Sequence, residues 1–367
     1  MRIGIVTQQL RNNYGGLLQN WALQQILLKM DHEPITLNYE NFFRLPPWYR
    51  RILSHIKTIA TWMVPGRRRP WIRYEVFNRS RVSHKFICNH INVTPPFRKY
   101  RSGLVGKHCL EAVITGSDQV WRPQYNPGYV DKMFLSFVED SGIKKIAYAA
   151  SFGTSAWEFT AEEEKKCADS IRRLDNVSVR EKSGVVLCRE HFGIESTCVL
   201  DPTMLLDREY YDNLIEGSTT PDGPYMLAYI LDNELYDKTK VERLGQSLGL
   251  PVKLVYADDE MSLEVEEWIA MFKNAAYVVT NSFHGTVFSI IYHRPFLSLV
   301  HEGRGSARFF DLLEQFNLSD RLIAELPEAC DAISDIDWDA VDSRLADRRQ
   351  LSIEWLKNSL VPTNTES

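Results

Sequence analysis

The stretch that decides the fold lies late in the chain and reads Tyr277-Val-Val-Thr-Asn-Ser-Phe-His-Gly-Thr-Val-Phe-Ser-Ile-Ile-Tyr-His-Arg-Pro-Phe296. Its first four residues form a short β-rich run, which predicts a buried parallel strand. Small and polar residues follow, and then an apolar run typical of a helix, which Pro295 ends. His284 is therefore expected at the carboxyl end of a strand, where open α/β sheets bind their ligands.

The same turn predicts a seat for an anion. Backbone amide groups that open a helix attract negatively charged groups, so we expect Ser282, Gly285 and Thr286 to line an anion site. A lone histidine near a strand end is more often a structural residue than a catalyst. The position of His284 alone therefore leaves both interpretations open.

Composition excludes several classes of protein. A chain of 367 residues is long enough for two domains, and its net charge of −5 gives no support for nucleic-acid binding by the whole protein. The six cysteines form no CxxC pair, which argues against a zinc site or a disulfide scaffold, and no other metal site is predicted. The sequence contains neither a signal peptide nor a membrane-spanning stretch, so we expect a cytoplasmic protein.

The order of the remaining patterns predicts two α/β domains. Strand patterns at 2–7, 35–39, 112–115, 145–150, 177–180 and 197–200 alternate with helical patterns, and polar clusters follow most of the strands. One crevice collects such clusters when parallel strands end at the same edge of a sheet. We expect a Rossmann-like domain at 1–206, a linker at 207–223, a second Rossmann-like domain at 224–330, and a C-terminal helix and tail at 331–367. Two doubly wound domains that face a cleft, with a closing C-terminal helix, describe the GT-B architecture.

An insertion at about 44–101 differs from the rest of the first domain. It contains fourteen Lys and Arg residues against one acid, Glu75. Apolar residues recur in it at helical spacing, at Trp48, Ile52, Ile56, Ile59 and Met63. A basic amphipathic helix of this kind contacts an anionic membrane surface, here through 44–70, or packs its apolar side on the protein. The sequence leaves both alternatives open.

Six motifs are weak singly and specific in this order: Asn13-Tyr-Gly-Gly-Leu-Leu-Gln19, Thr115-Gly-Ser-Asp-Gln-Val-Trp121, Ser151-Phe-Gly153, Val179-Arg-Glu-Lys-Ser-Gly184, Asp201-Pro-Thr203 and Thr280-Asn-Ser-Phe-His-Gly285. On these residues the chain resembles the polysaccharide pyruvyl transferases. The resemblance runs from the N-terminus to about Phe310 and leaves out the basic insertion.

The resemblance implies a GT-B-like enzyme that transfers pyruvate from phosphoenolpyruvate to two hydroxyls of a sugar. The product is a cyclic ketal, phosphate is released, and the sugar belongs to a capsular, exopolysaccharide or cell-wall precursor. It implies no cofactor, His284 as the acid and Arg180 as a donor-binding residue. Many members have Arg-Leu-His where this chain has Ser282-Phe283-His284. Another cation must therefore serve, and the candidates are Arg304 and, preferred, Arg308.

The chemistry of ketal transfer gives roles to further residues. A histidine suits protonation of the donor methylene carbon, because its ordinary pKa lies near neutral pH. Asp118 is the candidate base for the acceptor hydroxyl, although a turn or helix-cap aspartate explains it equally well. Trp121 either stacks on a sugar or is buried, Gly15 and Gly16 are expected to serve the turn, and Asp201 is expected to be a turn residue. The remaining candidates for substrate contact are Asn13, Tyr14, Gln19, Gln119 and Ser151.

Three functions therefore remain for comparison. The leading one is a ketal-pyruvyl transferase whose partners are phosphoenolpyruvate and a glycan acceptor, lipid-linked if 44–70 contacts the membrane. The second is a GT-B glycosyltransferase that uses a nucleotide sugar. The third is a non-catalytic glycan-binding protein of the same fold, which the loss of the arginine at position 282 favours.

Overall fold

A computed structural model describes residues 1–11, 13–39, 73–139, 142–219, 221–231, 237–256, 263–300, 307–327 and 335–361, and only the backbone of 73–81. The predicted amphipathic helix around Trp48 to Met63 lies outside these residues, as does Arg304. None of the described helices is long and apolar enough to cross a membrane.

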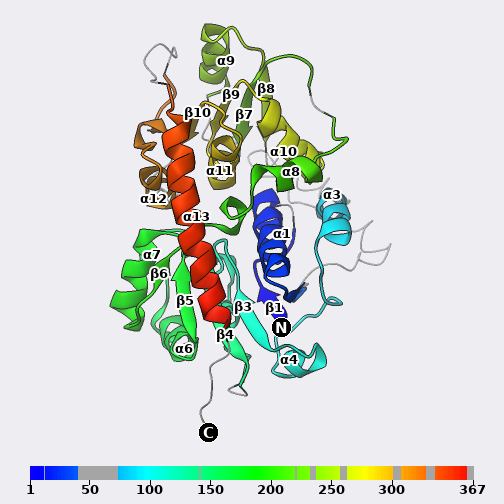
Figure 1. Cartoon of the computed structure of the whole chain (residues 1–367), viewed down its shortest axis with the longest axis vertical. Helices are drawn as coiled ribbons and strands as arrows, with labels where there is room; N and C mark the ends of the chain where they lie inside the picture. Colours follow the sequence, from blue (N-terminus) through cyan, green and yellow to red (C-terminus); the bar gives the residue numbers. More distant parts are fainter. Residues whose placement is uncertain are drawn as a thin grey trace, which may run out of the picture.

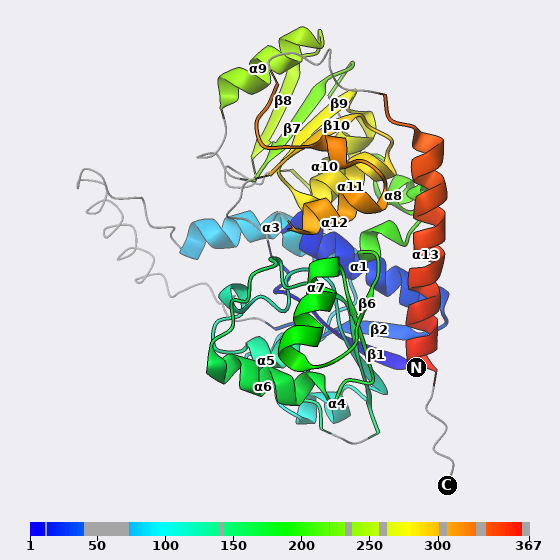
Figure 2. The same cartoon turned by 90° about the vertical axis from the view of Figure 1, so that its left-hand side faces the viewer.

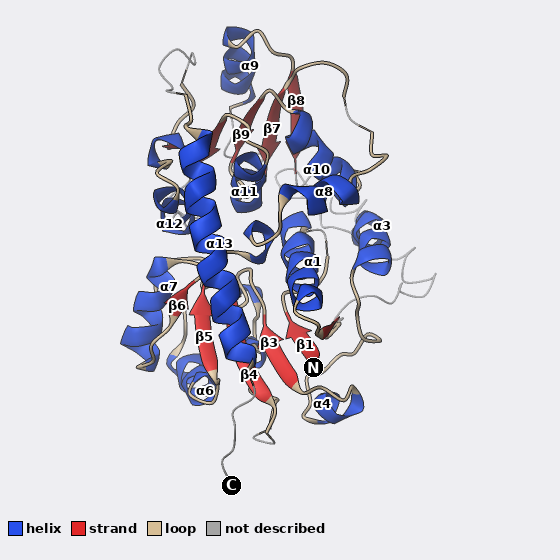
Figure 3. Ribbon diagram, in the orientation of Figure 1, coloured by secondary structure: helices blue, strands red, loops and turns tan. Residues whose placement is uncertain are grey.

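The first sheet has six parallel strands in the order β2-β1-β3-β4-β5-β6. Figure 3 shows β1, β3, β4, β5 and β6 side by side. Its strands are β1 (Arg2–Val6), β2 (Glu33–Thr36), β3 (Ala112–Thr115), β4 (Lys144–Ala150), β5 (Asn176–Val179) and β6 (Thr197–Cys198). Its central strands are almost wholly buried, as expected when helices cover both faces of a parallel sheet.

The second sheet repeats this topology with five parallel strands in the order β11-β10-β9-β7-β8. Its strands are β7 (Met226–Ile230), β8 (Val252–Tyr256), β9 (Tyr277–Thr280), β10 (Phe296–Leu299) and β11 (Leu322–Ile323). The prediction of two doubly wound sheets is confirmed. Strand β11 was not predicted, because two residues carry no measurable period.

Both sheets reverse their strand order at a defined point, between β1 and β3 in the first and between β7 and β9 in the second. Ligands of open α/β sheets bind in the crevice at such points, beyond the carboxyl ends of the strands. The loops that follow β1 and β3 carry Asn13 and Asp118, and His284 lies in the first turn of α11, the helix that follows β9. The topology therefore places these predicted site residues at the two switch points.

The described helices mostly cover these sheets. They are α1 (Tyr14–Lys29), α3 (Arg73–His90), α4 (Gly103–Lys107), α5 (Val130–Met133), α6 (Ala161–Ile171), α7 (Lys182–Leu187), α8 (Arg208–Leu214), α9 (Lys238–Ser247), α10 (Val265–Asn274), α11 (Phe283–Ile291), α12 (Ala307–Gln315) and α13 (Trp338–Leu360). The segment predicted as a linker at 207–223 contains α8, whose Tyr211 is fully buried.

Helix α1 begins at Tyr14, although the apolar run that predicts a helix in this part of the sequence starts only at Leu17. The side chain of Asn13 accepts a hydrogen bond from the amide of Gly16, which is the interaction of a helix N-cap. Gly15 and Gly16, expected in a loop, therefore form the first turn of the helix. This placement brings their backbone to the boundary between the two sheets, where α1 lies in Figure 2.

The C-terminal helix α13 runs along both domains (Figure 1). Its first half meets the second domain, where His293 bonds to Asp342 at 2.8 Å and stacks on Trp338. Its second half meets the first domain, where Ser352 accepts the amide of Leu200 at 3.0 Å. The prediction of a closing helix is confirmed.

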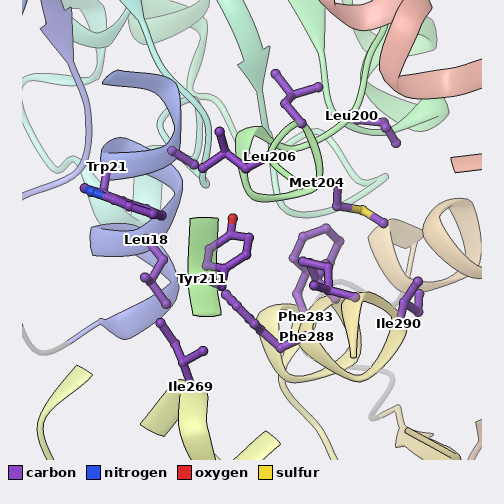
Figure 4. Packing of buried hydrophobic residues seen from close by; sticks show 14 of the residues in the cluster. Leu18, Trp21, Leu200, Met204, Leu206, Tyr211, Ile269, Phe283, Phe288 and Ile290 are labelled. Atoms are coloured by element: carbon purple, nitrogen blue, oxygen red, sulfur yellow. The ribbon is translucent and has the colours of Figure 1, made fainter. Parts of the chain in front are cut away.

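An apolar core continues from one domain to the other. The rings of Trp21 in α1 and Phe288 in α11 both pack on Tyr211, with ring centroids 5.6 and 5.1 Å apart (Figure 4). The hydroxyl of Tyr14 adds a polar link by donating to the backbone oxygen of Leu263. These contacts join the two domains and hold the residues at the facing ends of the two sheets close to one another.

Candidate active site

The ring of His284 lies directly against the backbone of α1. A Cβ atom added to Gly15 would lie 1.9 Å from His284 Nδ1, far inside contact distance. The absence of a side chain at Gly15 therefore makes room for a histidine from the opposite domain. This corrects the expectation that Gly15 serves the turn, since the residue is helical and has no left-handed backbone.

Asp201 connects the histidine to Arg180. Its Oδ2 atom accepts hydrogen bonds from Arg180 Nη1 and Ser117 Oγ, both at 2.8 Å, and lies 3.7 Å from His284 Nε2. The last distance is too long for a hydrogen bond, and the contact is an ion pair only when the imidazole of His284 is protonated. Burial alone would raise the pKa of Asp201, but His284, Arg180 and Thr203 hold it below the usual range.

Asp201 also forms the turn that the sequence predicts. Its Oδ1 atom accepts from the amide and the hydroxyl of Thr203, at 3.0 and 2.6 Å. One oxygen of the carboxylate therefore caps the turn, and the other serves the site. The expectation that Asp201 is a turn residue only was incomplete.

The guanidinium of Arg180 is buried but only partly bonded. Burial lowers its pKa, yet the charges of Asp201 and Glu181 raise the value above that of an ordinary arginine. Its Nε and Nη2 atoms have no hydrogen-bond partner among the described residues. Buried N–H groups of this kind are costly unless a ligand satisfies them, so Arg180 can accept an anion.

Glu181 is a second buried carboxyl group beside Arg180. Its Oε1 atom accepts from Ser151 Oγ at 2.8 Å and from the amide of Phe152 at 2.9 Å. Its Oε2 atom lies 3.8 Å from Arg180 Nε. Burial raises the pKa of Glu181. Ser151, which was predicted to contact the substrate, donates its hydroxyl to this carboxyl group and holds it in place.

Arg308 approaches Arg180 from the other domain. Burial, followed by the charge of Arg180, lowers the pKa of Arg308 to about 10, so the guanidinium remains charged at neutral pH. Its Nε atom has no hydrogen-bond partner in the described part of the chain. Both guanidinium groups lie over the ring of Phe283, with Cζ-to-centroid distances of 4.3 Å for Arg180 and 5.8 Å for Arg308.

Asp118 and Asn13 lie together at the switch point of the first sheet. Asp118 Oδ2 accepts from Asn13 Nδ2 at 2.9 Å, and Asp118 lies within electrostatic range of Arg180 and Arg308. Its φ of +73° is the left-handed conformation, which aspartate tolerates better than most residues. Such backbone strain gathers at functional sites. Asp118 is thus a turn residue that also lies near the two guanidinium groups of the site.

The prediction that the amide groups of Gly285 and Thr286 bind an anion is wrong. Ser282 caps α11, because its hydroxyl accepts the amide of Gly285 and its backbone oxygen accepts the amide of Thr286. A Cβ on Gly285 would also meet Thr280 Oγ1 at 2.4 Å, so the glycine allows the helix to approach β9. All three residues therefore build the helix start, and Phe283 and His284 carry the remaining first-turn amides.

Four further predicted contacts are engaged within the protein. Trp121 is fully buried, stacks on Phe134 and donates to a backbone oxygen, so sugar stacking is excluded in this structure. Gln19 is fully buried and donates to Thr7 Oγ1. Tyr14 makes the interdomain bond described above. Gln119 Oε1 accepts from Arg122 at 3.0 Å. These four side chains therefore stabilise the fold through contacts within the protein.

The site therefore joins His284, Arg180, Arg308, Asp118 and Asn13 from the predicted set. Sequence reasoning missed the contributions of Asp201, Glu181, Phe283 and Gly15. The signal for Asp201 and Glu181 was present, because each follows a strand of the first sheet at its carboxyl end. No sequence signal marks Phe283 or Gly15, since their roles depend on contacts across the domain boundary.

Comparison with protein-family models gave a match over most of the chain. The model of the polysaccharide pyruvyl transferases matches residues 13–303. The chain belongs to the polysaccharide pyruvyl transferase family. This is a transferase family, and the match covers Asn13, Asp118, Arg180 and His284 but ends before Arg308. A comparison with curated protein sequences found no match.

Comparison with solved structures found distant similarities that extend over most of the chain. UDP-GlcNAc 2-epimerase from Methanocaldococcus jannaschii is 11% identical, with a TM-score of 0.43 over 94% of this chain and 92% of that one. ADP-heptose LPS heptosyltransferase II from E. coli is 12% identical, with a TM-score of 0.37 over 96% and 99%. The glycosyltransferase SsfS6 from Streptomyces sp. SF2575 is also 12% identical, with a TM-score of 0.38 over 97% and 96%.

Proposed function

We propose that this protein transfers pyruvate from phosphoenolpyruvate to two hydroxyls of a sugar in a polysaccharide precursor, forming a cyclic ketal and releasing phosphate. One observation carries the proposal. Arg180 and Arg308 meet at the ring of Phe283 from opposite domains, with N–H groups that have no partner among the described residues, and His284 lies 3.7 Å from the carboxylate of Asp201 that Arg180 also contacts. This arrangement suits a small, highly charged anion that has to be protonated on carbon.

The donor is bound mainly by the two arginines. A guanidinium presents two parallel N–H groups to a phosphate or a carboxylate, and phosphoenolpyruvate carries one of each. Arg308 supplies the cation that the serine at position 282 cannot supply. A bound anion also offsets the repulsion between the two guanidinium groups, so their proximity favours ligand binding.

Protonation of the donor starts the reaction. His284 donates a proton to the methylene carbon, and the central carbon becomes an oxocarbenium-like cation. A sugar hydroxyl attacks this carbon while Asp118 takes the proton of that hydroxyl. Proton transfer by a positioned side chain contributes about 10²–10⁴-fold to a rate.

Ring closure completes the ketal. The bond between the central carbon and the phosphate oxygen breaks, and the second sugar hydroxyl attacks the same carbon. One of the two hydroxyl protons replaces the proton that His284 gave, and the other leaves with phosphate. The protonation of the site is thus the same before and after each turnover, and no cofactor is required.

Fewer residues can be assigned to the binding of the acceptor than to the binding of the donor. Among the described residues, Asn13 is the predicted acceptor contact that lies beside Asp118, the proposed base, and its side chain is exposed. We expect the acceptor to be a cytoplasmic glycan precursor, lipid-linked if residues 44–70 contact an anionic membrane. Sedimentation with anionic vesicles, with and without 44–70, tests that contact, and equal sedimentation of both proteins would exclude it.

Thermal shifts with phosphoenolpyruvate, UDP and GDP test the donor class, because a ligand that binds only the folded state raises Tm. The informative variant is Arg308→Met, since truncating Arg180 would also leave Asp201 unpaired. Arg344→Met, at an exposed arginine of α13, is the matched control. We expect phosphoenolpyruvate alone to raise the Tm of the wild type and of the control, and not that of Arg308→Met.

The alternatives give different results. A shift with a nucleotide alone would identify a glycosyltransferase, and no shift with any of the three would favour a glycan-binding protein. His284→Gln separates binding from chemistry. We expect it to bind phosphoenolpyruvate within about threefold of wild type and to lose about 10²–10⁴-fold in phosphate release. Normal turnover by this variant would exclude His284 as the acid.

A further inference from the structure

Phe283 contacts two charged side chains that come from different domains. It is the first residue of α11, while Arg180 follows β5 and Arg308 lies in the first turn of α12. The two guanidinium carbons are 4.3 and 5.8 Å from the centre of its ring. The ring is itself held edge-on by Phe309, at a centroid distance of 6.1 Å and an angle of 76°.

The environment of the two arginines is unequal. Arg180 has carboxylate partners, at 2.8 Å in Asp201 and at 3.8 Å in Glu181. Among the described residues, Arg308 has no ion-pair partner. It lies against two aromatic rings instead, because its Cζ atom is also 5.5 Å from the centre of Phe309.

An aromatic ring stabilises a cation without neutralising it. The negative face of the ring attracts a guanidinium, most strongly where water is excluded. A carboxylate in this position would bind Arg308 more tightly, but it would also compete with an anionic ligand. The ring therefore offsets part of the repulsion between Arg180 and Arg308 while it leaves their N–H groups available.

We propose that Phe283 is a positioning residue for anion binding, whose ring holds Arg180 and Arg308 so that one phosphate or carboxylate group fits between them. The inference rests on the proposed function for the identity of the anion, phosphoenolpyruvate. It goes beyond that function in assigning a binding role to an apolar side chain that touches no charge of the ligand. Because position 282 carries serine, the second cation comes from α12, and Phe283 fixes its place.

Phe288 provides a matched control. It lies on the same helix, is fully buried and packs on Tyr211 and Trp268, and no guanidinium group of the described residues lies over its ring. Phe283→Leu and Phe288→Leu each remove one ring from α11 and retain an apolar side chain. Both variants should lower Tm by a few degrees. Only Phe283→Leu should weaken anion binding.

The test is isothermal titration of the full-length protein with phosphoenolpyruvate and, separately, with inorganic phosphate. We expect Phe283→Leu to raise Kd for both by about three- to thirtyfold, the effect of losing one desolvated cation–π contact. Phe288→Leu should leave both Kd values within twofold of wild type. During turnover Phe283→Leu should raise KM for the donor and leave kcat nearly unchanged.

Two results would overturn the inference. One is a folded Phe283→Leu variant with wild-type Kd values, and the other is an equal loss of affinity in Phe288→Leu, which would indicate general loosening. If Phe283→Leu does not fold, Arg308→Lys replaces it, because lysine keeps the charge and loses the planar group. A wild-type Kd in Arg308→Lys would also overturn the inference.

We call the arrangement of Arg180 and Arg308 around the ring of Phe283 the clamp. The same experiment tests the clamp separately from the proposed reaction. A wild type that binds phosphate but shows no preference for phosphoenolpyruvate, with the same dependence on Phe283, would support the clamp and overturn the donor assignment. Binding of phosphoenolpyruvate that does not depend on Phe283 would support the donor assignment and overturn the clamp.

Discussion

Gly15→Ala should disable the site while leaving the fold nearly as stable as before. The added Cβ would lie 1.9 Å from His284 Nδ1 and 2.5 Å from Cε1, whereas ordinary contacts begin near 3.4 Å. The imidazole ring, or the whole second domain, must therefore move by about 1.5 Å. A displacement of about 1 Å in a catalytic group can cost about 10²-fold in rate.

Two opposing effects determine the stability of this variant. Overpacking costs about 1–3 kcal/mol. Alanine is favoured over glycine inside a helix by about 1 kcal/mol, and Gly15 lies in the first turn of α1. The net loss should be about 0–2 kcal/mol, which is a change in Tm of a few degrees. Activity and stability should therefore separate clearly.

The assay is phosphate release from phosphoenolpyruvate, with any acceptor that supports turnover by the wild type, together with a thermal melt. We expect kcat/KM to fall by at least about 10²-fold in Gly15→Ala. Gly106→Ala in α4 is the control, because its added Cβ meets nothing within 4 Å. It should retain full activity and have an equal or slightly higher Tm. Wild-type kcat/KM in Gly15→Ala would refute the placement of His284 against α1.

Three further variants test individual contacts. Asp201→Asn leaves Arg180 buried beside a neutral partner and should cost about 3 kcal/mol at pH 7. Because the folded pKa of Asp201 is lowered, the stabilisation that it contributes is complete above its unfolded pKa of about 3.9 and is lost as the pH falls below that value. In urea titrations between pH 3 and 7, the free energy of unfolding of the variant should therefore decrease less steeply toward acid pH than that of the wild type. Arg308→Met removes a partly buried cation whose pKa is lowered and should raise the free energy of unfolding of the ligand-free protein by about 0.5–2 kcal/mol; a decrease in a urea titration would contradict this. Tyr14→Phe removes the bond to Leu263 and should lower stability by about 1 kcal/mol without changing donor affinity, whereas an unchanged Tm with a raised KM for the acceptor would restore Tyr14 as a substrate contact.

Local sequence patterns predicted much of the fold. Strand β9, the turn after it and helix α11 were expected from a β-rich run, small polar residues and an apolar run. Helix α6 begins at Ala161, directly after its N-cap Thr160, whose capping box with Glu163 marks the start. These features depend on neighbours within a few residues, so a single sequence reveals them. The start of α1 was missed because a side-chain cap at Asn13 outweighs the loop tendency of two glycines.

What the sequence by itself determined is the set of polar residues at strand ends, among them His284, Asp118 and Arg180. The parallel α/β order placed that set in one crevice, because the carboxyl ends of parallel strands share an edge. Only the tertiary structure decided which of these residues face a ligand. Burial gave Trp121 and Gln19 to the core, and contact between the domains gave Arg308 its place beside Arg180. The physical reason is that burial and charge pairing depend on residues far apart in the chain, which no local pattern records.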